Sequence, residues 1–160
     1  MKRLRTRWNV AAVFAIVTLG LAVVDTQAPP QKTAEKSLYD RLGGVYSIAT
    51  VVDDFIERLL VNNTLNANRA IAESRARVPK AGLKFQVTTL VCEVTGGPCK
   101  YTGRTMKASH DHLNITESEW QAMVVDFRAT LDKFKVPQKE QQELITIVGT
   151  TKGDIVKTGS

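Results

Sequence analysis

Apolar residues spaced for one face of a helix constrain the fold of this chain more than any other feature. Between residues 48 and 60 they recur at intervals of three and one, which places a broad apolar stripe along one side of a helix. The stripe consists of Ile48, Val51, Val52, Phe55, Ile56, Leu59 and Leu60. Segments 83–94 and 120–134 repeat the pattern. With 160 residues, of which 43% are hydrophobic, the chain is predicted to form one all-α domain.

The two later segments each predict a set of inward-facing residues. These are Leu83, Val87, Leu90, Val91 and Val94, followed by Trp120, Met123, Val124, Phe127, Leu131 and Phe134. Thr88, Thr89 and the neighbouring valines leave a strand as the alternative for the first set, although the spacing favours a helix.

Capping and breaking residues predict the helix boundaries in the first half of the domain. Ser37 is placed to cap a short helix that ends after Leu42, where Gly43-Gly44 follows. The long helix then ends near Asn62-Asn63. Residues 64–77 lack a regular pattern and are interpreted as a loop with at most one helical turn.

The second half has equally local signals. Gly96-Gly97-Pro98 ends the helix over 83–94, and residues 106–113 are expected to be helical in part. Thr116 and Glu119 form a capping box, in which each side chain satisfies a free amide at a helix start. A last helix begins at Pro137 and is predicted to end before Gly149, with a loose tail beyond it. Its inward residues are Leu144, Ile147 and Val148.

Residues 1–28 have the composition of an export signal. Four basic residues precede an apolar run that ends at Val24, and Ala28 stands where a signal peptidase can cut. The run from Trp8 to Val24 is short for a bilayer span, so an uncleaved anchor is the alternative. Both interpretations place the folded part outside the cytoplasm, whether periplasmic, secreted or membrane-anchored. Residues 29–36 are predicted to be a linker, 37–156 the folded domain and 157–160 a tail.

The net charge of +6 does not by itself indicate a nucleic-acid partner. Residues 1–28 hold four of the 22 basic residues and one of the 16 acidic residues, so half of the surplus lies in the export segment. Both signs are interspersed in the remainder, as on an ordinary solvated surface. No nucleic-acid binding is therefore expected, and membrane contact is expected only through an uncleaved N-terminal segment. Cys92 and Cys99 allow at most one disulfide, which an oxidising compartment permits.

The two histidines, His110 and His112, are the candidate metal ligands. Side chains two positions apart on a helix point about 200° apart, so the pair cannot ligate one metal from the same face. A single histidine can hold iron when other donors complete the site, as the four nitrogens of a porphyrin do. From the pattern alone, an exposed or satisfied histidine is the commoner role for such a residue.

An ordered series of short motifs resembles the group I truncated haemoglobins. The motifs are Ser37-Leu-Tyr-Asp-Arg-Leu-Gly-Gly44, Val51-Val-Asp-Asp-Phe55, Gly96-Gly-Pro98, Tyr101-Thr-Gly103, Met106-Lys-Ala-Ser-His110, Ile115-Thr116 and Leu131-Asp-Lys-Phe-Lys-Val-Pro137. The resemblance covers residues 37 to 156. It implies a two-over-two helical sandwich around haem b, with His110 as the proximal ligand of the iron. The sixth position of the iron would stay free for a diatomic gas such as O2, NO or CO.

The resemblance also implies which residues line the cofactor. On the proximal side these are Met106, Ile115, Trp120 and Val124, and on the distal side Phe55, Leu83 and Val87. Tyr101, Arg104 and Lys107 are the candidate partners of the haem propionates. His112 is not required by the family pattern and is expected to be solvated.

The chain departs from the family pattern at two places on the distal side. The tyrosine that commonly follows the phenylalanine of the second helix is replaced by Ile56, which has no hydroxyl to donate to a gas. Gln86 is the candidate amide donor in its place, in a register that is fixed to within one residue. Residues 66–69 read Asn-Ala-Asn-Arg where many globins carry a phenylalanine packed on the haem. This difference bears on the distal wall and on haem retention.

The expected function is therefore that of an extracytoplasmic haem globin that binds a diatomic gas, in oxygen transport or NO detoxification. Turnover of the NO dioxygenase type would need a reductant that the sequence does not identify. The alternative is a helical sensor or interaction module that keeps the globin fold and has lost or altered gas binding. Haem content and gas binding distinguish these two interpretations.

Overall fold

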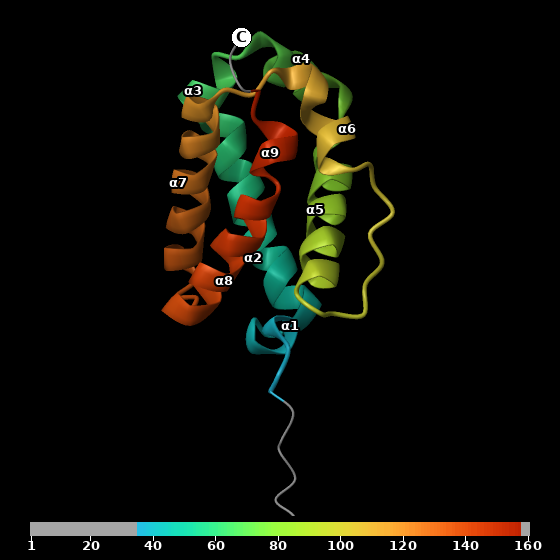
Figure 1. Cartoon of the computed structure of the whole chain (residues 1–160), viewed down its shortest axis with the longest axis vertical. Helices are drawn as coiled ribbons and strands as arrows, with labels where there is room; N and C mark the ends of the chain where they lie inside the picture. Colours follow the sequence, from blue (N-terminus) through green and yellow to red (C-terminus); the bar gives the residue numbers. More distant parts are fainter. Residues whose placement is uncertain (1–34, 158–160) are drawn as a thin grey trace, which may run out of the picture. The chain divides into compact units, whose positions relative to one another are not determined.

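The computed structural model describes residues 35–157, and helices joined by short segments make up this part of the chain (Figure 1). The helices are α1 (Leu38–Arg41), α2 (Gly44–Val61), α3 (Asn63–Asn66), α4 (Arg69–Arg77), α5 (Lys80–Val94), α6 (Met106–His110), the 3-10 helix η1 (Asp111–Leu113), α7 (Glu117–Lys133), α8 (Gln138–Thr150) and α9 (Lys152–Ile155). An isolated bridge pairs Ile115 with Val156. The all-α prediction is confirmed.

Helix α2 occupies the centre of the domain and packs against both α5 and α7. Ile48, Val52 and Ile56 are its buried residues, each 4% exposed or less, and they meet the α5 residues Leu83 and Val87. A second cluster joins α1, α7 and α8 through Leu38, Phe127, Leu131 and Leu144. The rings of Phe55 and Phe127 connect the two clusters, with their centroids 5.1 Å apart. The apolar stripes predicted from the sequence therefore form the core.

The predicted caps are present. The Ser37 hydroxyl accepts a hydrogen bond of 3.1 Å from the Asp40 amide at the start of α1. Gly43 and Gly44 adopt φ values of +86° and +78°, which a residue with a Cβ rarely adopts, and they redirect the chain into α2. At the start of α7 the Glu119 amide donates to Thr116, and the Thr116 amide donates to the Glu119 carboxylate over 2.7 Å. This is the capping box predicted from the sequence.

The interpretation of residues 64–77 as a loop is wrong. This region contains α3 and α4, and each of these helices begins at an asparagine whose side chain caps it. The Asn62 side chain accepts from the Leu65 amide over 3.2 Å, and the Asn68 side chain accepts from the Ala70 amide over 2.9 Å. Because these helices are short and partly polar, their apolar periodicity is weak, and the caps are the better signal.

The other corrections concern exposure and the C-terminal end. Val94 is 46% exposed, although its spacing predicts an inward position. Helix α8 continues through Gly149 to Thr150, and α9 follows in place of the predicted loose tail. The Lys157 amide donates to the Ile115 carbonyl over 2.9 Å, which fastens this end of the chain beside the start of α7.

Among the helices of residues 35–157, none has the length and hydropathy needed to cross a bilayer. The predicted signal or anchor of residues 1–28 lies outside the described residues, as do most of the linker and the last three residues of the tail.

Candidate haem site

His110 closes the short helix α6, which follows an eleven-residue irregular segment, residues 95–105, after α5. Figure 1 shows this segment turning at the lower end of α5 and running back along it, so that α6 lies near the end where α5 begins. The Thr105 hydroxyl caps α6 by accepting a hydrogen bond of 3.1 Å from the Ala108 amide. The Asn68 side chain holds the following turn by donating to the Leu113 carbonyl over 3.0 Å. These local bonds determine where the imidazole lies.

The His110 ring is half-buried and has one nitrogen already engaged. Its Nδ1 lies 2.8 Å from the Met106 carbonyl oxygen. A neutral ring that donates from Nδ1 keeps the lone pair of Nε2 for a metal. Burial lowers the pKa of His110, and this effect outweighs the opposing one of the Met106 carbonyl. The imidazole is therefore held in the neutral form that ligates iron.

His112 has different surroundings from His110. It lies on η1 and is exposed to solvent. The structure thus places the two histidines in distinct environments, one half-buried with an oriented ring and the other at the surface.

The predicted distal residues from α2 and α5 come together. Phe55, Ile56, Leu83 and Val87 belong to one apolar cluster, in which Ile56 is 3% exposed. This confirms that the position after Phe55 points into the interior, where it offers methyl groups in place of a hydroxyl.

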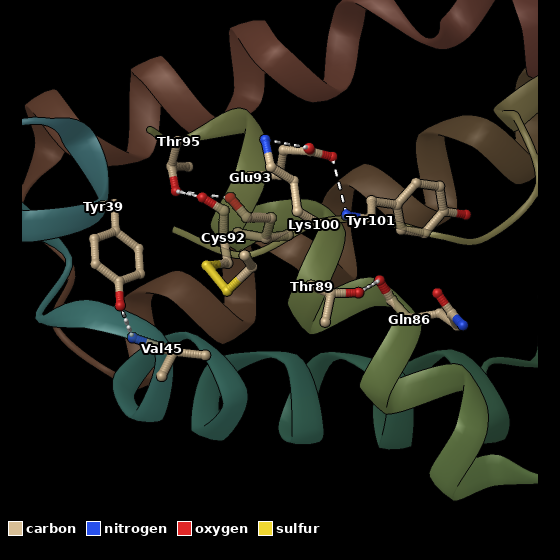
Figure 2. The surroundings of a disulfide bond; sticks show 11 residues. Tyr39, Val45, Gln86, Thr89, Cys92, Glu93, Thr95, Lys100 and Tyr101 are labelled. Atoms are coloured by element: carbon tan, nitrogen blue, oxygen red, sulfur yellow. Dashed lines mark hydrogen bonds and ion pairs between the residues drawn. A yellow bond between two sulfur atoms is a disulfide. The ribbon is translucent and has the colours of Figure 1, made fainter. Parts of the chain in front are cut away.

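Gln86 lies on α5, one residue before Val87, and Figure 2 shows its side chain projecting from this helix. Its Oε1 atom is buried, and among the described residues it is the one such side-chain atom that lacks a hydrogen-bond partner. An unsatisfied buried amide costs stability, so this atom is a candidate partner for a bound ligand or an ordered water. Which end of the amide faces that ligand is set by a rotation about the last side-chain bond.

The predicted proximal residues lie in two groups. Trp120 and Val124 on α7 line a cavity of about 160 Å³ together with Phe127 on the same helix and Ile145 and Val148 on α8. Ile115 is 7% exposed and packs in a different cluster with Leu65 and Ile71. Met106 is half-buried at the start of α6. Ile145, which also lines this cavity, is not among the inward residues that the sequence predicts for the last helix, although it lies one turn after Gln141.

The three propionate candidates lie on the segment before α6 or on α6 itself. The Tyr101 hydroxyl donates to the Arg104 carbonyl over 2.7 Å. The Arg104 and Lys107 side chains are exposed, and the Lys107 ammonium is 3.9 Å from the Asp111 carboxylate. Both cations are therefore available to an acidic group at the edge of the site.

Residues 66–69 present polar side chains in place of the phenylalanine of many globins. Asn66 donates to the Leu60 carbonyl over 3.1 Å and accepts from Arg75. Arg75 also donates to the Leu59 carbonyl over 2.7 Å. This hydrogen-bonded network, with the two asparagine caps, fills the turn after α2.

Comparison with known proteins decides the family. The family model described as "Bacterial-like globin" matches residues 37–157. The chain is a bacterial-like globin. The Group 1 truncated hemoglobin GlbN of Synechocystis sp. is 30% identical over 120 residues, which cover 71% of this chain and 90% of that protein. Group 1 truncated hemoglobin LI410 of Chlamydomonas moewusii is 23% identical and covers 90% of this chain and 81% of its own length. This globin therefore belongs to the group 1 truncated haemoglobins.

Solved structures agree with this assignment. The 2/2 hemoglobin of Synechococcus sp. PCC 7002, in the cyanomet state with covalently attached heme, has a TM-score of 0.67 at 25% identity. That match covers 76% of this globin and 98% of the other chain. The Fe(III) form of the truncated hemoglobin from Tetrahymena pyriformis has a TM-score of 0.68 at 20% identity and covers 77% of this globin. The two-over-two fold is thereby confirmed.

The cofactor of this globin is haem, as in the family to which it belongs. The residues of the structure fit that group. His110 presents a neutral, oriented imidazole, and Gln86 presents a buried polar atom that no protein group satisfies. An axial ligand holds the iron, and the polarity of the distal side tunes how a gas binds to it.

Proposed function

We propose that this globin binds a diatomic gas, O2, NO or CO, reversibly at a haem iron ligated by His110. The orientation of the His110 imidazole supports this proposal. Its Nδ1 is hydrogen-bonded to the Met106 carbonyl, so the lone pair of its Nε2 is free to ligate the iron. When bound, the haem would supply the iron at which the gas binds.

The chain's own residues determine how firmly a gas is held. Ile56 provides an apolar surface without a hydroxyl, so a gas that accepts hydrogen bonds gains nothing from this position. Gln86 is the polar side chain with an unused buried atom, and rotation of its amide presents an N–H to the gas. We therefore expect fast dissociation of O2, because one amide replaces the stronger hydroxyl donor.

The other predicted site residues have simpler roles in this proposal. Phe55, Leu83 and Val87 exclude water from the distal side, and Trp120 and Val124 do so from the proximal side. Tyr101, Arg104 and Lys107 hold the propionates at the edge. Oxidation of NO to nitrate would additionally require a reductant from outside the chain.

We further propose that the globin domain works outside the cytoplasm. The basic and apolar residues of 1–28 support export. The pairing of Cys92 with Cys99 supports the same location, since structural disulfides persist in oxidising compartments. A fusion of residues 1–36 to a reporter that is active only after export tests this part, and Ile16→Arg in the fusion should abolish reporter activity.

Gas titration of the full chain, reconstituted with haem and reduced, tests the function. We expect the main absorption band to shift with CO and with O2, and to return when the gas is removed. Stoichiometric haem whose spectrum responds to none of O2, CO and NO would contradict the proposal and favour a sensor or interaction module. Absence of haem from the folded, helical protein would contradict both the function and the assigned ligand.

A further inference from the structure

The disulfide between Cys92 and Cys99 joins the distal helix to the segment that leads to the proximal histidine. Cys92 lies on α5, six residues after Gln86, and is fully buried. Cys99 lies beyond the Gly96-Gly97 turn, eleven residues before His110, and is half-buried. The Cα atoms of the two cysteines are 5.7 Å apart. One covalent bond therefore fixes the distance between the element that carries Gln86 and the chain that carries His110.

Polar contacts hold the same segment, but each is weaker than a covalent bond. The Gly97 amide donates to the Cys92 carbonyl over 2.8 Å. The Tyr101 amide donates to the Glu93 carboxylate over 3.1 Å, as Figure 2 shows. Lys100 adds only a 3.9 Å ion pair to Glu93, and its own side chain is 86% exposed. Each of these contacts breaks and re-forms far more easily than a covalent bond, and the Lys100 ion pair is also screened by solvent.

Protein side chains pack less closely around α6 than around α2 and α7. Every residue of this helix is at least partly exposed, in contrast to α2 and α7. A segment with few buried apolar groups opens locally at low cost. Of the interactions that join α5 to the segment before α6, the disulfide is the covalent one.

We propose that Cys99 is a site of thiol–disulfide exchange, and that the Cys92–Cys99 bond controls how long the globin retains its haem. The intact bond holds the segment 96–105 along α5 and keeps α6, with His110, in place. Opening the bond frees this segment and speeds haem loss. The proposal rests on the proposed function, in which His110 ligates the haem.

Burial selects the sulfur that an incoming thiol reaches. Because Cys92 is fully buried, the thiolate of a dithiol reductant attacks Cys99 Sγ, and the bond between the two protein sulfurs breaks. A mixed disulfide forms on Cys99, and Cys92 leaves as a thiolate that takes up a proton. The second thiol of the reductant then attacks the first sulfur of the reductant, which is bonded to Cys99 in the mixed disulfide. This attack releases Cys99 as a thiol. The dithiol is oxidised to a disulfide, and the protein disulfide is reduced to two thiols.

Haem transfer from the full-length holoprotein to an excess of an apoglobin acceptor tests the proposal. The rate is measured for the oxidised protein and after treatment with a dithiol, and free thiols are counted on the same samples. The control is Cys92→Ala/Cys99→Ala, which has no bond to open. We expect two free thiols in the treated protein and haem loss faster by on the order of tenfold. The double variant should lose haem fast with and without the dithiol.

Three results would overturn the proposal. The first is a treated protein with two free thiols whose haem loss is unchanged. The second is a native protein in which the dithiol yields no thiols, since Cys99 would then not be an exchange site. The third is a double variant that retains haem as well as the oxidised protein.

Hydrogen exchange separates failure of this proposal from failure of the proposed function. In the haem-free protein, reduction should speed exchange of the amides of residues 96–110 and leave those of α2 unchanged. If this occurs but haem binding does not depend on His110, the ligand assignment is wrong, and the disulfide still restrains the segment 96–105. If exchange is unchanged, the disulfide does not restrain this segment, and the proposal is wrong independently of haem binding.

Discussion

The core built on α2 and the segment that carries His110 are held by different kinds of interaction. In the core, Ile48, Val52 and Leu131 are buried to 4% exposure or less by side chains from other helices. Residues 96–113, by contrast, are restrained by the disulfide, by the hydrogen bond from Tyr101 to the Glu93 carboxylate and by the Thr105 helix cap. The difference implies that global stability and the geometry of the haem site can be changed independently. The site segment can move while the core stays folded.

The largest effect on stability is expected from the core. Leu131 is fully buried, so Leu131→Ala should lower the free energy of unfolding by about 3 kcal/mol, through lost burial and a residual cavity. Chemical denaturation of the haem-free protein measures this. The control is Val125→Ala on the same helix, where the side chain is 64% exposed and the change should stay within about 0.5 kcal/mol. Equal effects of the two substitutions would contradict the core described above.

A smaller effect is expected at the turn beside the disulfide. A Cβ on Gly97 would lie 2.7 Å from the Cys92 carbonyl oxygen and 2.7 Å from its sulfur, so Gly97→Ala should cost about 2 kcal/mol. Gly82 on α5 has open space around it, and Gly82→Ala should instead stabilise by about 0.5 to 1 kcal/mol. Thermal unfolding with a count of free thiols measures both. If Gly97→Ala formed the disulfide fully and kept its stability, the segment would be looser than the structure indicates.

Asp54 provides a pH-dependent test of the core. Burial opposes ionisation of this carboxyl group, but hydrogen bonds from Lys133, Arg58 and Thr130 outweigh it and lower its pKa to about 2. A carboxyl group whose pKa is lower in the folded state contributes stability above its unfolded pKa, and this stability is lost as the pH falls from about 4 to about 2.

Asp54→Asn should therefore remove about 1 to 2 kcal/mol at pH 7 and almost nothing at pH 2. Unfolding free energies of the haem-free protein across this range give the comparison. Glu73→Gln is the control, because the ion pair of Glu73 with Arg69 is largely exposed. Parallel pH profiles for Asp54→Asn and the unsubstituted protein would show that the α2 to α7 contact does not depend on the charge.

Gln86 should give the smallest change in stability, together with a change in gas binding. Gln86→Leu removes a buried oxygen that has no partner, so the haem-free protein should gain up to about 1 kcal/mol. The same substitution should speed O2 dissociation, because it removes the amide proposed to donate to the gas. Stopped-flow mixing of the O2 complex with CO measures the rate, and exposed Gln142 on α8 offers Gln142→Leu as the control. A slow O2 dissociation that Gln86→Leu leaves unchanged would remove Gln86 from the account.

The core could be predicted from the sequence, whereas part of the site could not. Residues 48–60 repeat one apolar face over several turns, so their helix and their inward side could be identified without the structure. Residues 64–77 were misinterpreted because their helices are short and start from asparagine caps. Helix α9 is one short turn without a regular apolar pattern, and contacts with distant residues hold it, among them the pairing with Ile115 and the ion pair between Lys152 and Glu117.

The histidine ligand required the family resemblance, because an isolated histidine has no periodic pattern of its own. His110 is hydrogen-bonded to the Met106 carbonyl, and the Thr105 hydroxyl caps its helix. Both contacts depend on where the chain turns into α6. The unsatisfied oxygen of Gln86 could be found only in three dimensions, since the sequence shows a glutamine but not the lack of a partner. The pairing of Cys92 with Cys99 was permitted by the sequence and is present in the structure.

The most direct test of the central claim is the absorption spectrum of the full-length protein with haem, reduced and exposed to CO, in His110→Ala and His112→Ala. We expect His110→Ala to lose the spectrum of a histidine-ligated haem and to keep its helix content. His112→Ala should match the unsubstituted protein, because His112 is exposed on η1. If both variants kept the spectrum, or both lost it, His110 would not be the ligand that this site provides.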